Sequence, residues 1–216
     1  NLADDLRTVL EELDLRDAVL VGHSMGGIAV QALAAYHPDV VRERVRGIVL
    51  LSTLASTPFS GIAPLHWLVD RHGNLLPDVG GLMGRRNLGL LLARIGFGRG
   101  AQPSHVELVR HMIESCDPET TRGSIRALLG LDLVPDIGRI HVPTLVVCGT
   151  ADLLTPPAES RRIAEAIAGA RLELLPGGGH MLMLERSEEV DRLLLDFAHE
   201  VLTGAWGRPE AVGGGA

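Results

Sequence analysis

The sequence lacks several features that would point to particular classes of protein. No apolar run approaches the roughly 20 residues that a membrane-spanning helix needs. Its 20 Lys and Arg residues, against 27 Asp and Glu, form no cluster that could follow a phosphate backbone, so we expect no nucleic-acid partner. Two cysteines in 216 residues make no disulfide framework, which favours a reducing compartment, the cytoplasm.

Motifs for metal and phosphate binding are missing as well. The histidines outside the motifs described below show no His-Glu-x-x-His or comparable spacing, so we expect no metal site. The three glycines at 177–179 are followed by His180, and not by the Lys-Ser/Thr of a phosphate-binding loop. We therefore expect no cofactor.

The residues that are present indicate a compact α/β protein. Hydrophobic residues make up 46% of the chain and charged residues 22%, and the length suffices for one domain with a sizeable core. Apolar runs predict strands at 18–21, 47–51, 143–148 and 172–175, and periodicity predicts helices at 2–13, 25–36, 157–168 and from Ser187 onward. We expect the first strand to be buried on both faces. This order predicts an open, mostly parallel sheet flanked by helices.

A long insert separates the second and third predicted strands. It runs from 54 to 142, far longer than an ordinary connection, and its later part has helical patterns. We expect a mostly helical lid over the carboxyl edge of the sheet, on a core formed by 1–53 and 143–203. The glycine-rich tail, 204–216, is expected to be flexible.

The segment GHSMG, residues 22–26, matches the pattern G-x-S-x-G. It lies between a predicted strand and a predicted helix, where a sharp turn would lift the Ser24 hydroxyl above the sheet. We expect Gly22 and Gly26 to be required because side chains there would collide across the turn. The Met25 N–H would face a developing oxyanion, and His23 should point away from Ser24. The alternative is an incidental serine in a glycine-rich turn.

Two later residues are candidates to activate that serine. His180 follows the last predicted strand and Asp152 follows the third, so both belong to the same sheet edge as Ser24. A histidine there could take the serine proton, and a carboxylate could hold the imidazole in the required tautomer. The alternatives are a loop histidine bonded to backbone and an aspartate that caps a turn before Pro156.

Three segments resemble the α/β-hydrolase superfamily, in its lid-bearing branch of bacterial esterases and lipases. They are VLVGHSMGG, LVVCGTADLLTPP and LLPGGGHMLMLERSEEV, and they resemble the nucleophile elbow, the acid segment and the histidine loop with its closing helix. The resemblance implies that Ser24, Asp152 and His180 form a catalytic triad in the order usual for that fold. Such motifs are poor guides to the substrate.

The sequence departs from the family pattern before the elbow. Family members carry further strands there, and a His-Gly loop that donates the second oxyanion N–H. The only His-Gly dipeptide here, His72-Gly73, follows the nucleophile and is interpreted as a chance turn. We expect the chain to be an N-terminally truncated piece of a longer hydrolase.

The leading functional expectation is a serine hydrolase that cleaves a small or medium carboxylic ester through an acyl-enzyme. The same groups would serve a thioester, lactone, amide or carbon–carbon substrate, or a cofactor-free perhydrolase. The alternative of another class is a non-catalytic protein that binds a ligand or a partner chain. Apolar residues at Met83, 88–92 and 181–184 are candidates for an acyl pocket, although core packing is the favoured interpretation.

Overall fold

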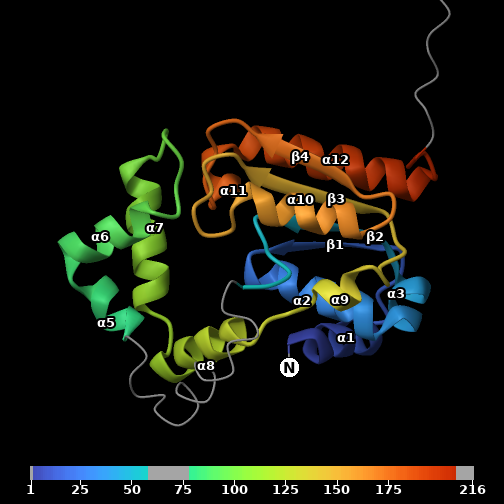
Figure 1. The fold of residues 1–216 in the computed structure, drawn as a ribbon, viewed down its shortest axis with the longest axis horizontal. Coiled ribbons are helices and arrows are strands. Elements are labelled where there is room, and N and C mark those ends of the chain that lie inside the picture. Colours follow the sequence, from blue (N-terminus) through green and yellow to red (C-terminus); the bar gives the residue numbers. More distant parts are fainter. Residues whose placement is uncertain (1, 58–77, 208–216) are drawn as a thin grey trace, which may run out of the picture.

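The computed structural model describes residues 2–57 and 78–207, and it contains one parallel sheet of four strands in chain order (Figure 1). The strands are β1 (Ala18–His23), β2 (Val45–Leu51), β3 (Thr144–Gly149) and β4 (Arg171–Leu175). In this register Leu20 lies opposite Ile48, and Leu50 lies opposite Val146. The predicted open parallel sheet is therefore confirmed, and its carboxyl ends all lie along one edge.

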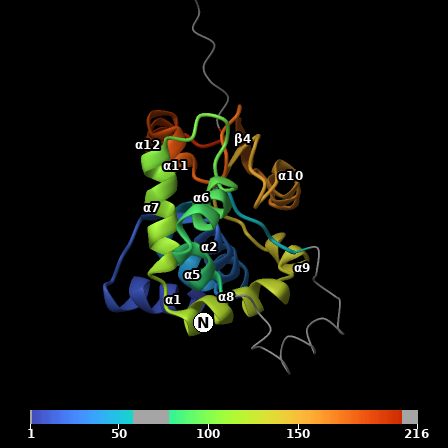
Figure 2. The same ribbon diagram turned by 90° about the vertical axis from the view of Figure 1, so that its left-hand side faces the viewer.

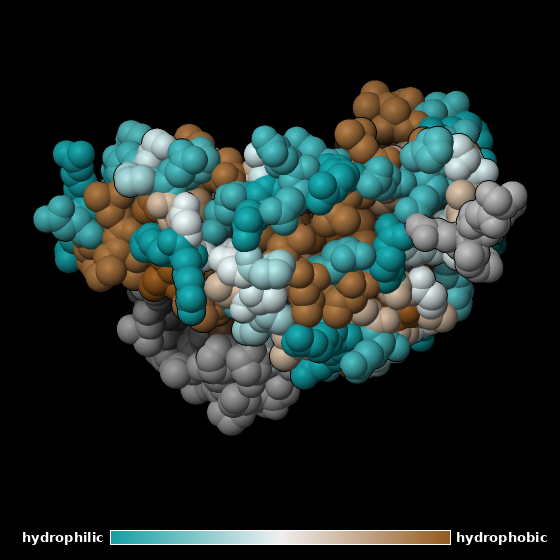
Figure 3. Space-filling view, turned by 90° about the horizontal axis from the view of Figure 1, so that it is seen from above, coloured by the Kyte–Doolittle hydropathy of each residue, from teal (hydrophilic) through white to brown (hydrophobic). Residues whose placement is uncertain are grey.

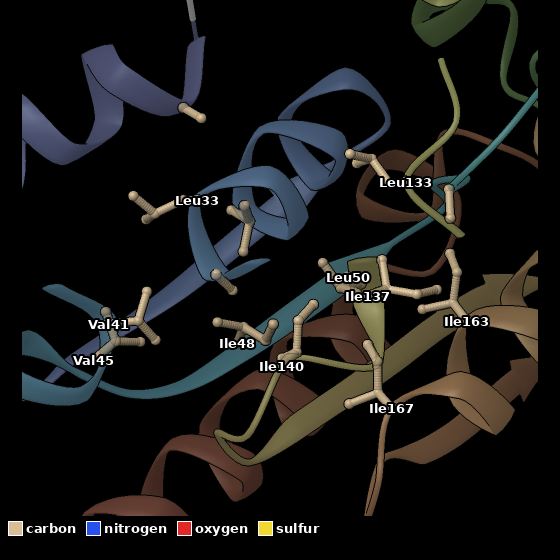
Figure 4. Packing of buried hydrophobic residues seen from close by; sticks show 14 of the residues in the cluster. Leu33, Val41, Val45, Ile48, Leu50, Leu133, Ile137, Ile140, Ile163 and Ile167 are labelled. Carbon is tan, nitrogen blue, oxygen red and sulfur yellow. The ribbon is translucent and has the colours of Figure 1, made fainter. Parts of the chain in front are cut away.

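One face of the sheet is covered by helices from both parts of the chain. They are α1 (Leu2–Glu12), α2 (Met25–Tyr36), α3 (Pro38–Arg44), α9 (Val134–Ile137) and α10 (Pro157–Ala166). Figure 4 shows the core on this side, where Ile48 and Leu50 of β2 pack with Leu33, Ile137 and Ile163 from the helices. This core joins segments far apart in the sequence.

The other face is covered by α11 (Leu182–Glu185) and α12 (Ser187–Thr203). Val49 and Leu51 of β2 point to this side and pack against Phe197 and Val201 of α12. Successive residues of β2 thus enter two different cores, which explains why the strand is an unbroken apolar run. The buried side chains of α12 are Val190, Phe197 and Val201.

The expectation that β1 is buried on both faces is wrong. It is an edge strand of the described sheet, and Val21 is 47% exposed. Helix α12 covers this face of β1 incompletely, because Val19 on the same face is partly buried against the core under α12 whereas Val21 is exposed. Val9 of α1 and Leu13, which directly follows that helix, are exposed as well.

The described part of the insert consists of helices α5 (Val79–Gly84), α6 (Arg86–Arg94), α7 (Pro103–Glu114) and α8 (Pro118–Leu129), followed by α9. Figures 1 and 2 show α5, α6 and α7 gathered beside the sheet, at the end where α11 lies. Asp117 caps the start of α8, because its carboxylate accepts the Thr120 N–H. His72-Gly73 and the tail beyond 207 lie outside the described residues.

A buried arginine fastens two of these helices together. Arg110 of α7 donates to the Met83 carbonyl of α5 at 2.8 Å and pairs with Glu107 and Glu114 at 3.0 and 2.8 Å. Its charge is fully paired in a site where an unpaired cation would be strongly unfavourable. Among residues 2–57 and 78–207, no helix is long and apolar enough to cross a membrane.

Candidate active site

Ser24 occupies the turn between β1 and α2 in a strained backbone conformation. Its φ and ψ angles are 52° and −118°, a combination that non-glycine residues rarely adopt. The turn is held by its own backbone, since the Ser24 N–H donates to the Leu51 carbonyl at 3.0 Å. The Ser24 carbonyl in turn accepts the Thr53 hydroxyl at 2.7 Å. The end of β2 and the residues just after it thus hold Ser24 in a conformation that an isolated chain would avoid.

The glycines around this turn differ from the expectation. A Cβ on Gly22 would lie 2.6 Å from the Gly26 carbonyl oxygen, so Gly22 is required as predicted. The expectation for Gly26 is wrong, because a Cβ there would meet nothing within 4 Å. The second constrained position is Gly27, where a Cβ would lie 2.6 Å from the Thr53 side chain. Helix α2 approaches the end of β2 at Gly27, whereas Gly26 faces outward.

Asp152 and His180 form a buried hydrogen-bonded pair. Their side chains are 0% and 7% exposed, and the distance from His180 Nδ1 to Asp152 Oδ2 is 3.0 Å. Asp152 lies just past β3, and His180 lies on the loop after β4. Because Ser24 follows β1, the three predicted residues all lie at the carboxyl edge of the parallel sheet.

The Asp152 carboxylate is saturated with donors. Its Oδ1 accepts the backbone N–H groups of Leu154 and Thr155, each at 2.9 Å, and its Oδ2 accepts the Thr155 hydroxyl at 2.7 Å as well as His180. Burial alone would raise the pKa of Asp152, but the bonds from His180 and Thr155 outweigh it and lower that pKa. The group is therefore a carboxylate anion beside an imidazole.

Thr155 contacts both members of the pair. Its hydroxyl oxygen lies 3.2 Å from His180 Nδ1 as well as 2.7 Å from Asp152 Oδ2. Thr155 was not among the residues expected from the sequence. The signal was present, because an aspartate followed at the third position by threonine is the spacing of a side-chain-capped turn.

His23 contacts the candidate base directly. Its ring packs on the His180 ring with 4.8 Å between the two ring centroids. His23 Nε2 lies 2.9 Å from the His180 carbonyl oxygen, and since a carbonyl only accepts, this nitrogen carries the proton. Burial lowers the pKa of His23, which favours the neutral ring. His23 therefore supports the backbone of His180.

The insert also grips the loop that carries His180. The Gly96 carbonyl, just after α6, accepts the N–H groups of His180 and Met181 at 2.9 and 3.1 Å. The Glu185 carboxylate accepts the Gly98 N–H at 2.7 Å and the Gly179 N–H at 3.1 Å. Two segments more than 80 residues apart in sequence are thus joined at the candidate histidine. Sequence patterns gave no sign of these bonds, because the donors and the Gly96 acceptor are backbone groups.

Other groups that could act as nucleophiles or metal ligands are not arranged for that chemistry. Cys148 is fully buried in β3, and burial raises the pKa of its thiol to about 11. Within the part of the chain that the structure describes, no group of three or more His, Cys, Asp or Glu residues could hold a metal ion. Met25 is the first residue of α2, where helix N–H groups have no partner within the helix.

Known proteins with similar sequences are enzymes of several kinds. A putative carbamate hydrolase of Caulobacter sp. is 32% identical over 198 residues, which cover 91% of this chain and 70% of that protein. A non-heme chloroperoxidase of Kitasatospora aureofaciens is 29% identical, with 92% of this chain and 74% of that protein covered.

Solved structures agree with these matches. The enol-lactonase of Burkholderia xenovorans superposes with a TM-score of 0.73 at 28% identity, covering 92% of this chain and 72% of that one. An esterase of Exiguobacterium antarcticum has a TM-score of 0.74 at 21% identity over 91% and 72% of the chains, which supports the fold alone. The model of the alpha/beta hydrolase family matches residues 1–193. The chain belongs to the alpha/beta hydrolase family.

Proposed function

We propose that this α/β-hydrolase enzyme cleaves a small or medium carboxylic ester through an acyl-enzyme intermediate. Ser24 is the nucleophile, His180 the general base and acid, and Asp152 the residue that orients His180. The substrate is a small molecule, and the insert, 54–142, serves as a lid over the core formed by 1–53 and 143–203.

The observation that carries this proposal is the buried Asp152–His180 pair at the sheet edge where Ser24 is strained. The carboxylate accepts from Nδ1 at 3.0 Å, which leaves Nε2 of His180 unprotonated and able to take a proton. A strained serine between a strand and a helix is the geometry of a nucleophile elbow. A strained serine and a histidine held by a carboxylate are the groups that acyl transfer through a serine nucleophile requires.

The reaction follows from these roles. His180 Nε2 takes the Ser24 proton as the oxygen attacks the ester carbonyl, and the imidazolium then gives that proton to the leaving alcohol. Asp152 stays ionised and stabilises the imidazolium throughout. Water activated by His180 then hydrolyses the acyl-enzyme and frees Ser24.

The oxyanion formed in both steps needs hydrogen-bond donors. We assign one to the Met25 N–H, because Met25 directly follows the nucleophile and opens α2. The helix dipole adds a favourable partial charge at that end. Losing one such donor typically slows acyl transfer by about 100–1,000-fold.

The test is hydrolysis of p-nitrophenyl butyrate, with a fluorophosphonate label to mark the nucleophile. Ser24→Ala should abolish labelling and lower kcat by about 10⁴-fold or more. Ser52→Ala is a matched control, since Ser52 also has positive φ, 44°, at the end of β2 but is fully buried. It should keep both turnover and label. Equal activity of Ser24→Ala and the unmodified chain would refute the mechanism.

The substrate panel should include other acyl compounds. A relative named as a putative carbamate hydrolase and a solved enol-lactonase are reasons to assay a carbamate and a lactone beside the ester. The same three residues can open each of these. Absence of turnover and of Ser24 labelling across the panel would favour the non-catalytic binding protein.

A further inference from the structure

A cavity of about 540 Å³ lies between the insert and the candidate histidines. Helices α5, α6 and α7 form one wall, and His23, Leu154 and His180 form part of the other. Its volume falls within the range of small-molecule sites. The cavity therefore opens directly beside the proposed general base.

The lining of this cavity is almost entirely aliphatic or thioether. Met83, Leu92, Val109 and Met181 are typical members, and among the described lining residues the two histidines are the only titratable ones. Burial lowers the pKa of His23, so that ring is no ready partner for an anion. Met83, Leu92 and Met181 come from segments for which core packing was the favoured interpretation, and here they border open space.

Several of these apolar side chains are about half exposed. Ile95 is 43% exposed, Leu154 51% and Met112 56%, although all three line the cavity. Figure 3 shows hydrophobic surface on the insert, at the left of that view. Apolar groups gathered around a concave site are stabilised when a ligand removes them from water.

Building on the proposed function, we propose that this cavity binds an uncharged, medium-length hydrocarbon chain of the ester. Each methylene that leaves water on binding would raise kcat/KM, by up to about fourfold. A carboxylate at the end of the same chain would be desolvated without a cation to pair with, which is strongly unfavourable. The site therefore selects neutral, hydrophobic esters over acidic ones of equal length.

The substrate test compares chains of matched length. p-Nitrophenyl octanoate should be hydrolysed with at least tenfold higher kcat/KM than the butyrate. The mono-p-nitrophenyl ester of octanedioic acid, with the same length and a terminal carboxylate, should fall about 100-fold below the octanoate. Methyl octanoate and octyl acetate then distinguish a chain on the acyl side from one on the alcohol side.

The variant test adds a cation at the mouth of the cavity. Met112→Arg should lower kcat/KM for the octanoate about tenfold and raise it for the acidic ester, because arginine pairs with the carboxylate. Leu108→Arg is the matched control, one turn earlier on α7, 47% exposed and outside the cavity lining. It adds the same charge and should leave the ratio of the two substrates unchanged.

The outcomes separate this inference from the proposed function. Turnover that depends on Ser24 but is indifferent to chain length, with Met112→Arg matching Leu108→Arg, would overturn the cavity assignment and leave the esterase intact. If the protein hydrolyses none of these esters, the cavity assignment is tested by calorimetry, which measures the binding of methyl octanoate to Ser24→Ala. Binding that Met112→Arg weakens and Leu108→Arg does not would support the cavity, and lack of binding would refute it.

Discussion

Replacing Thr155 by valine isolates one hydrogen bond of the buried Asp152–His180 pair. Valine keeps the shape and removes the hydroxyl that donates to Asp152 Oδ2 at 2.7 Å. A hydrogen bond to a charged acceptor contributes about 1.5–3 kcal/mol. Oδ2 still accepts from His180, so no further cost of an unpaired oxygen is added. For a chain of this size we expect Thr155→Val to lower Tm by about 3–12 °C.

The same change should alter the response to acid. Hydrogen bonds from His180 and Thr155 lower the pKa of Asp152 despite its burial, so the carboxylate stabilises the fold above its unfolded pKa of about 4. This contribution is lost as pH falls through the lowered pKa. Without the Thr155 hydroxyl the pKa of Asp152 rises, and the acid loss of stability should begin at a higher pH.

Urea unfolding followed by circular dichroism from pH 7 to pH 3 measures both effects. Thr155→Ser is the converse control: it removes the methyl group but keeps the hydroxyl, so it should keep the acid response of the unmodified chain. A double-mutant cycle with Asp152→Asn should show that the valine change costs much less when the charge is absent. A Thr155→Val chain within about 0.5 kcal/mol of the unmodified one, or an equal cost in both backgrounds, would refute this account.

Three further predictions concern the surroundings of the site. Glu185→Ala should speed hydrogen exchange at the Gly179 amide about 10–100-fold, since it removes a charged acceptor. Gly27→Ala should lower the free energy of unfolding by about 1–3 kcal/mol through overpacking, whereas Gly26→Ala should change it by less than about 1 kcal/mol. Burial lowers the pKa of His23, so its contribution to stability should be lost as pH falls from about 6.5 toward that lowered pKa, and His23→Gln should flatten this part of the curve.

Each of these has a contrary result. Unchanged hydrogen exchange at the Gly179 amide in Glu185→Ala would contradict a protecting bond from the Glu185 carboxylate. Equally fast exchange in Glu188→Ala, a change at an exposed glutamate, would contradict it too. Equal stability of the two alanine variants would contradict the close approach of α2 to β2. Parallel stability curves between pH 7 and 5 for His23→Gln and the unmodified chain would contradict a buried neutral imidazole.

Local patterns were sufficient for the four strands and for the longer helices that flank them, whereas the short helices α3 and α11 were not expected. Unbroken apolar runs located all four strands, and the start of α2 at Met25 and the cap at Asp117 follow from short-range chemistry. The exposure of Val21 was not predictable, because a run such as AVLV does not state how many neighbours the strand has. Burial depends on which strand lies at the edge, and that is a tertiary property.

The candidate site likewise has features that local patterns predict and features that depend on tertiary structure. Asp152 and His180 were found from their places after strands, and the structure brings them together at 3.0 Å. Gly26 and Gly27 are adjacent glycines that the sequence alone does not distinguish. The Thr53 side chain, which lies against Gly27, decides which of them is required. The contact of His23 with His180 was not predictable, because the elbow pattern says nothing about a ring that reaches a loop 157 residues away.

The bonds from Gly96 to His180 and Met181 have a consequence for recombination and engineering. Exchanging inserts between relatives would test the proposed substrate cavity, since the insert forms one wall of it. Here the carbonyl that holds the histidine loop belongs to the insert and not to the sheet. A chimera cut at 54 and 142 would discard that carbonyl with the old insert. Retaining 95–98, or choosing a donor with an equivalent loop, is therefore the condition for an active hybrid.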